Sequence, residues 1–253
     1  MRCRLVGSEM CIRDSSNDDF SRNFIRNNVL PLLESQWPKA AAQLAQMAKI
    51  AAETKELNRL LVDDHWPSLE PRPERWGHSI AIAALMAKAP PLRAALLRHW
   101  LAGKGVTPEQ VHLQEIENLI NARADRTPVF ELGAISLRRF NGRLYLLTLP
   151  AMPEPCEFVG RTQLSDGSEV IVTGCNEPLS VRFRTEGLRA KPNGRAHSQT
   201  LKKLLQEKSI APWLRPRLPL IYQGEQLLAV ADLWVEASAG ERLPSLCVEW
   251  RTP

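Results

Sequence analysis

The sequence lacks several features that would assign it to a common class of protein. No apolar run approaches the roughly 20 residues that a membrane-spanning helix needs, because Arg, Lys or Pro interrupts each one. The G-x-x-x-x-G-K-[ST], G-x-G-x-x-G and G-x-S-x-G motifs are absent. No C-x-x-C pair occurs, and no cysteine lies at zinc-site spacing from a histidine. These absences argue against a membrane protein and against the enzymes that those motifs define.

The 5 cysteines and 5 histidines are scattered along the chain. Because secretory features are missing, we expect free thiols in a reducing cytoplasm, with a structural disulfide as the weaker alternative. Neither His65 beside Asp63 and Asp64 nor His99 beside Trp100 forms a recognisable ligand set. Taken alone, the residues do not predict a catalytic or metal site.

Positive charge is abundant, and it is concentrated in one segment. Residues 182–217 contain 10 Arg and Lys and 2 Glu, a net charge of +8, whereas the rest of the chain, with 23 basic and 26 acidic residues, sums to −3. Such a concentration favours nucleic-acid binding over the alternative of an ordinary solvated surface.

Helical patterns dominate the N-terminal half. They cover residues 20–33, which Pro31 should kink or divide, about Pro38 to about Asp64, Pro90 to about Gly103, and a segment opened by Thr107, Pro108 and Glu109. Residues 67–77 contain three prolines and predict a connector. Residues 20–123 therefore predict an antiparallel helical unit.

The pattern then changes to strands. Alternating residues on both sides of Asn141-Gly142 predict a β-hairpin. Residues 151–180 predict a linker with short strands, and the segment from about Leu179 predicts a strand, a basic loop, a helix and further strands. The expected fold class is α+β: a helical middle domain with a β-hairpin, followed by a small mixed α+β C-terminal domain.

The basic loop suggests a phosphate site. Ser198 is expected to cap the helix that follows, so that its free N–H groups face the same side as Arg195 and His197. Arg182 and Arg184 alternate with apolar residues and should project from one face of a strand.

Several segments resemble a known family. "NDDFSRNFIRNNVLPLLESQWP" resembles the region just after the catalytic domain of bacterial tRNA(Ile)-lysidine synthases, and residues 192–235 resemble their C-terminal domain. The hairpin "FELGAISLRRFNGRLYLL" is in the expected place. The opening "MRCRLVGSEMCIRDS" instead resembles a translated sequencing-adapter segment.

This resemblance implies a division of the chain. We expect adapter-derived residues at 1–15, the end of the catalytic-domain region at 16–36, a helical substrate-binding domain with a terminal β-hairpin at 37–150, a linker with short strands at 151–178, and a C-terminal tRNA-binding domain at 179–253.

The activity that the resemblance implies is ATP-dependent ligation. Such enzymes adenylate the wobble cytidine of tRNA(Ile), and L-lysine then displaces AMP to form lysidine. The family's ATP and Mg²⁺ site lies in an N-terminal PP-loop domain with an S-G-G-x-D-S loop, and this sequence has no such loop. We therefore expect a fragment without that domain, which binds neither cofactor and is inactive alone.

Site residues follow from the resemblance and the charge. The family's R-N-x-x-R pattern matches Arg22, Asn23 and Arg26 at the active-site rim. The expected RNA-binding residues are Arg182, Arg184, Arg189, Lys191, Arg195, His197, Lys202 and Lys203. Expected partners are tRNA(Ile), with L-lysine and ATP through the missing domain, and a second copy in a homodimer; no membrane is expected, and the location is cytoplasmic.

Two other functions fit the residues as well. One is a stand-alone module that binds structured RNA. The other is a protein–protein interaction domain whose basic face meets an acidic partner.

Overall fold

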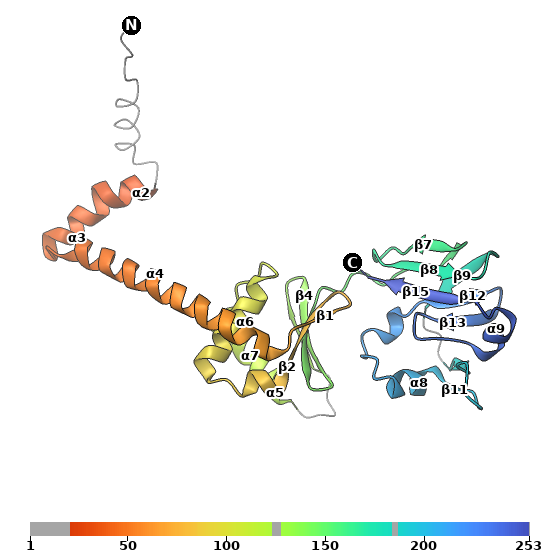
Figure 1. The fold of residues 1–253 in the computed structure, drawn as a ribbon. Helices are drawn as coiled ribbons and strands as arrows, with labels where there is room; N and C mark the ends of the chain where they lie inside the picture. The colour runs from red at the N-terminus through yellow and green to blue at the C-terminus, as the bar shows by residue number, and fades with distance from the viewer. Residues whose placement is uncertain (1–20, 123–127, 184–186, 253) are drawn as a thin grey trace, which may run out of the picture. The chain divides into compact units, whose positions relative to one another are not determined.

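The computed structural model describes residues 21–122, 128–183 and 187–252. The chain divides into two units, one ending at Asp64 and the other beginning at His65, and each is described by itself (Figure 1). The predicted adapter segment and Arg184 lie outside the described residues. Within the described ranges, no helix is both long and apolar enough to cross a membrane.

The first unit is helical. Its elements are α2 (Ser21–Phe24), the π-helix η1 (Ile25–Val29), α3 (Leu30–Gln36) and α4 (Ala40–His65). Residues 21–36 stay helical through Pro31, so the helix is not divided there; a π-helical stretch, Ile25–Val29, precedes this residue, and Pro31 lies in the first turn of α3. Proline has no backbone N–H, and the first turn of a helix tolerates it because N–H groups there have no partner within the helix.

Helix α4 matches the helix predicted from about Pro38 to about Asp64. Its Ala, Lys, Glu and Gln residues are good helix formers, and Arg59 pairs with Glu56 at 2.7 Å and Asp63 at 2.6 Å along the surface. Among its described residues only Val62 is buried. Local propensity and surface ion pairs therefore support most of this helix.

The second unit begins with helices and an antiparallel sheet. Its first elements are η2 (Trp66–Leu69), β1 (Arg72–Glu74), β2 (Gly77–Ala81), α5 (Ile82–Met86), α6 (Pro90–Ala102), α7 (Gln110–Asn121), β3 (Val129–Leu132), β4 (Ile135–Phe140) and β5 (Arg143–Leu147). The strand order is β1-β2-β5-β4-β3. The predicted helix from Pro90 to about Gly103 is confirmed as α6.

The hairpin predicted at Asn141-Gly142 joins β4 to β5. Both turn residues have positive φ, +43° and +73°, as a two-residue type I′ turn requires. The register pairs Phe140 with Arg143 across the turn.

The prediction of a plain connector at residues 67–77 was wrong. This segment contains β1 and the start of β2, which pair with Arg72 opposite Ser79 and Glu74 opposite Gly77. Pro73 is accommodated because β1 is an edge strand, where a missing N–H costs no ladder hydrogen bond on the open side. The prolines therefore concealed a short hairpin.

The remainder of the second unit is mixed α+β. Its elements are β6 (Cys156–Phe158), β7 (Arg161–Gln163), β8 (Glu169–Thr173), β9 (Leu179–Arg182), β10 (Arg189–Ala190), β11 (Gln199–Thr200), α8 (Leu201–Glu207), η3 (Arg215–Arg217), β12 (Leu220–Gln223), β13 (Gln226–Val230), β14 (Trp234–Val235), α9 (Ala237–Arg242) and β15 (Cys247–Arg251). The sheets are β14-β13-β12-β9-β6, β15-β8-β7 and β10-β11. The predicted α+β class is confirmed.

One apolar core joins these sheets. Val170 and Trp250 from the three-stranded sheet share a cluster with Val181 and Ile221 from the five-stranded sheet. The strands predicted within the linker at 151–178 belong to these sheets, since β6 pairs with β9 and β8 with β15. The domain boundaries given above remain predictions.

Gly77 offers a test of the first sheet. A Cβ at this position would lie 2.0 Å from the Leu146 carbonyl oxygen of β5, whereas one at Gly142 meets nothing within 4 Å. We expect Gly77→Ala to lower the free energy of unfolding by about 3 kcal/mol or more, because backbone must move. Gly142→Ala should cost only about 1–2 kcal/mol, from its positive φ. Urea unfolding followed by circular dichroism measures both, and equal losses would contradict this account.

Candidate nucleic-acid interface

A basic loop, residues 187–200, carries four of the eight predicted RNA-binding residues: Arg189, Lys191, Arg195 and His197. Strands β10 and β11 pair at its base, with Arg189 opposite Thr200 and Ala190 opposite Gln199. Between them, residues 191–198 are exposed except for Pro192. A short two-stranded ladder thus presents a mostly solvent-exposed basic turn.

The buried carboxylate of Glu236 anchors this basic loop. Its Oε2 accepts the Lys191 backbone N–H at 2.8 Å, and its Oε1 accepts Trp234 Nε1 at 3.2 Å. Main-chain bonds add to the tether, from Asn193 N to Val235 O and from Ala237 N to Lys191 O, both 2.9 Å. The loop is therefore fixed to β14 and to the start of α9.

A tight turn sets the tip of the loop. Arg195 N donates to Pro192 O at 3.0 Å, and Gly194, the third residue of the turn, has φ +83°, a value that glycine adopts without strain. On the other side, a Cβ added to Gly240 would lie 3.0 Å from Asn193 Nδ2. The absence of a side chain at Gly240 lets the turn approach α9 closely.

The predicted helix cap at Ser198 was wrong. Helix α8 begins at Leu201, its N-cap is Thr200, and no side chain caps it. The Ser198 carbonyl accepts Arg189 Nη2 at 2.8 Å instead. Because residues 199–200 are extended and paired as β11, the helix starts later than the capping pattern predicts. The phosphate site expected from that cap is not built.

Four lysines remain exposed around the loop and α8: Lys191, Lys202, Lys203 and Lys208. Among the described residues, no carboxylate pairs with any of them. The leucines of α8, Leu201, Leu204 and Leu205, are buried as predicted, so the lysines of this helix face solvent. His197 is exposed as well.

The arginines are engaged within the fold. Arg182 binds both carboxylate oxygens of Glu225, each at 3.0 Å, and lies 4.6 Å from the centre of the Tyr222 ring. Arg195 Nη2 is 2.8 Å from Glu207 Oε2. Such exposed pairs contribute little energy, so they restrain these side chains without preventing a contact with RNA.

The contacts of Arg182 shift the pKa values of the groups around it. The hydrogen bond from Arg182, followed by its charge, lowers the pKa of Glu225, and the same hydrogen bond raises the pKa of Arg182. Burial raises the pKa of Tyr222, with the charge of Arg182 opposing it.

Two further arginines of the basic segment donate hydrogen bonds to main-chain carbonyl oxygens within the fold. Arg217 is buried and donates to Pro150 O at 2.5 Å and Ala151 O at 3.0 Å. Arg215 Nε donates to Ile210 O at 2.9 Å. Burial lowers the pKa of both guanidinium groups. These two charges are part of the packing and do not belong to the exposed surface.

The residues predicted at an active-site rim lie in the first unit. Arg22 is in α2 and Arg26 in the π-helix η1, and both are exposed, whereas Asn23 is half-buried. Nothing in the described residues tests their role, which stays a prediction. The same holds for the eight predicted RNA-binding residues.

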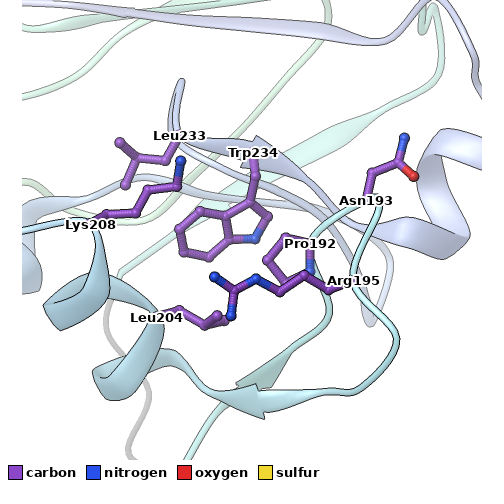
Figure 2. Close-up of a pocket in the computed structure, with 7 residues that line it drawn as sticks. All are labelled: Pro192, Asn193, Arg195, Leu204, Lys208, Leu233 and Trp234. Carbon is purple, nitrogen blue, oxygen red and sulfur yellow. The ribbon is translucent and has the colours of Figure 1, made fainter.

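A pocket of about 300 Å³ lies beside the loop, and the sequence did not predict it. It is lined by Pro192, Asn193, Arg195, Leu204, Lys208, Leu233 and Trp234 (Figure 2). These residues come from three separate segments, and no spacing in the sequence links them. Glu236 was missed for the same reason, since its partner Lys191 is 45 residues away.

Within residues 21–122, 128–183 and 187–252, no group of three or more His, Cys, Asp or Glu side chains gathers in a way that could hold a metal ion. Of the five cysteines, the three in the described ranges, Cys156, Cys175 and Cys247, are free thiols, as expected.

Two family models match the second unit. One, the TilS substrate binding domain, covers residues 80–145, and the other, the TilS substrate C-terminal domain, covers residues 179–250. The second match includes the basic loop, α8 and the pocket. These two matches define the class: the substrate-binding and C-terminal domains of the TilS family.

The names of curated relatives identify the family more closely. A protein named tRNA(Ile)-lysidine synthase from Yersinia pseudotuberculosis serotype I is 36% identical over 276 residues, which cover 96% of this chain and 59% of the relative. Proteins of that name from Serratia proteamaculans and Xylella fastidiosa are 37% and 38% identical, over 91% and 89% of this chain and 56% and 55% of their own. The chain belongs to the tRNA(Ile)-lysidine synthase family, and it spans about 59% of the length of the first of these relatives.

A solved structure described as the TilS C-terminal domain is also similar. It covers 39% of this chain and 98% of its own, at 19% identity and a TM-score of 0.32.

Removing the Glu236 carboxylate tests the anchor. We expect Glu236→Ala to lower the free energy of unfolding by about 1–3 kcal/mol, because two partly buried hydrogen bonds to this carboxylate are lost. Amide hydrogen exchange at Lys191 should accelerate. Glu225→Ala, which removes an exposed carboxylate, should leave the stability almost unchanged. Unchanged exchange at Lys191 in Glu236→Ala would rule the anchor out.

The Arg182–Glu225 pair makes a pH-dependent prediction. Since the folded-state pKa of Glu225 is lowered, the pair stabilises the fold above the unfolded pKa of Glu225, and this contribution is lost as pH falls through the folded pKa. Arg182→Ala should raise the pKa of Glu225 towards its ordinary value, and Arg189→Ala should leave it unchanged. A carboxyl titration by nuclear magnetic resonance measures both, and an equal pKa in the two variants contradicts the pairing.

Proposed function

We propose that this chain is the tRNA-binding part of an ATP-dependent ligase that converts the wobble cytidine of tRNA(Ile) to lysidine with L-lysine. The observation that carries the proposal is that the C-terminal family model spans the basic loop and the four exposed lysines around the loop and α8. The name shared by the relatives supports the substrate and the reaction.

The lysines give the interaction its physical basis. Exposed ammonium groups without carboxylate partners gain more from a phosphate than groups that must first break an ion pair. A-form RNA offers phosphates at regular spacing and is recognised largely by backbone and shape. Lys191, Lys202 and Lys203 would thus contact the backbone of a tRNA helix, with Arg182, Arg189, Arg195 and His197 around them.

The other roles belong to the same proposal. Arg22, Asn23 and Arg26 would lie at the rim of the active site, where a planar, permanently charged guanidinium suits phosphate. ATP, Mg²⁺ and L-lysine would be bound by residues other than those described, and we assign no chemical step to the described ones. A cytoplasmic location and a homodimer complete the proposal.

A salt series tests the RNA contact. Binding of the full chain to a tRNA(Ile) transcript is measured by fluorescence anisotropy at several salt concentrations. Lys202→Ala/Lys203→Ala should flatten the log–log salt slope by about 1.5 units, given about 0.7–0.9 per lost phosphate contact.

A control with the same change of charge separates contact from net charge. Lys39→Ala/Lys55→Ala removes two exposed lysines of the first unit and should leave the slope unchanged. An unaltered slope in the Lys202/Lys203 variant would show that α8 is only a solvated surface. Competition by an acidic peptide as effective as that by tRNA would favour the protein-interaction alternative.

A further inference from the structure

The pocket beside the basic loop has the composition of a site for a nucleobase. The half-buried indole of Trp234 lies among Pro192, Leu204 and Leu233 (Figure 2). The volume of the pocket, about 300 Å³, is at the lower end of the range for small-ligand sites. An aromatic face bordered by aliphatic side chains is a surface on which a planar base stacks.

The indole is held in one orientation. Trp234 Nε1 donates to the buried carboxylate of Glu236 at 3.2 Å, and its backbone pairs with Val230 of β13. The polar edge of the ring is therefore satisfied inside the protein. What remains for a ligand is apolar ring surface, which costs little to desolvate.

Two cations stand at the rim of the pocket. Lys208 is exposed and has no carboxylate partner among the described residues. The side chain of Arg195 is 41% exposed and pairs with Glu207, whose side chain is 36% exposed. Because a solvent-exposed pair is weak, Arg195 can exchange this carboxylate for a phosphate. The aromatic ring and the two cations thus line the same pocket.

The pocket is formed before a ligand arrives. Pro192 is buried, and Arg195 is the last residue of the turn that begins at Pro192. Lys191 and Asn193 are hydrogen-bonded to Glu236 and Val235. Little ordering entropy is then lost on binding. A base inside a duplex could not enter, since its faces are covered by its neighbours.

From these features we infer that the pocket holds one unpaired, unstacked nucleotide of the bound RNA, with its base on Trp234 and a flanking phosphate on Lys208 and Arg195. This inference rests on the proposed function and adds a second mode of contact to it. The lysines of α8 meet the backbone of a helix, whereas the pocket takes a nucleotide that extends from it. Stacking on an aromatic ring is tolerant of base identity, so the site selects strand geometry rather than sequence.

Two RNA probes test the inference. One is a blunt hairpin, and the other is the same hairpin with a two-nucleotide 3′ overhang, each labelled at the loop. The full chain should bind the overhang probe more tightly. Trp234→Leu should abolish this preference by weakening only the overhang complex, by about 5- to 150-fold. Lys208→Ala, at an exposed residue, should reduce the preference without any effect on folding.

Matched variants separate the pocket from the rest of the surface. Trp234→Phe keeps an aromatic face and should retain most of the preference. Lys202→Ala should weaken both probes equally. Circular dichroism and binding of the blunt probe establish that Trp234→Leu is folded, and Lys208→Ala decides the question if it is not.

The outcomes distinguish this inference from the proposed function. Equal binding of the two probes by the natural chain, or a preference that survives both Trp234→Leu and Lys208→Ala, overturns the pocket while leaving backbone binding intact. Failure of both probes to bind overturns the proposed function itself. If free adenosine monophosphate bound as tightly as the overhang probe, the site would be one for mononucleotides, and its assignment to RNA would be overturned.

Discussion

The interface depends on one buried carboxylate. Burial of a charge without compensation is costly, and Glu236 offsets that cost by accepting the Lys191 N–H and the Trp234 indole N–H. Its backbone carbonyl also accepts the N–H groups of Ala239 and Gly240 at the start of α9. A single residue therefore connects the loop, the edge strand and the helix, and it fixes Lys191 and Trp234 beside the pocket.

Charge in the basic segment is divided between two tasks. Arginine, with several donors in a rigid plane, suits fixed contacts with carbonyl and carboxylate oxygens, and Arg217, Arg182 and Arg189 are used in this way. Lysine is a flexible point charge that is strongly hydrated, and the lysines stay exposed. The net charge of the segment consequently overstates the charge available to a ligand. Its exposed lysines describe the electrostatic surface better than its total.

Local patterns in the sequence were sufficient for most elements of the fold. Helix α6, the turn at Asn141-Gly142 and the presence of further strands after α8 follow from periodicity and turn chemistry, which depend on neighbouring residues. Strand β1 was missed because Pro73 is tolerated only at an edge, and edges are set by tertiary pairing. The cap at Ser198 failed because pairing with β10 keeps residues 199–200 extended. The pocket and its anchor could not be predicted, since they join residues that only the folded chain brings together.

Main-chain atoms make most of the attachments of the loop. The bonds from Asn193 N to Val235 O and from Ala237 N to Lys191 O involve no side chain, and the side chains from Asn193 to Ser198 are exposed. Substitutions along this tip can therefore accumulate without displacing it, provided that Gly194 keeps its backbone freedom. Evolution can vary the chemistry displayed there while the supporting sheet stays constant, and a protein engineer could use the same tolerance to retarget the loop to a different RNA.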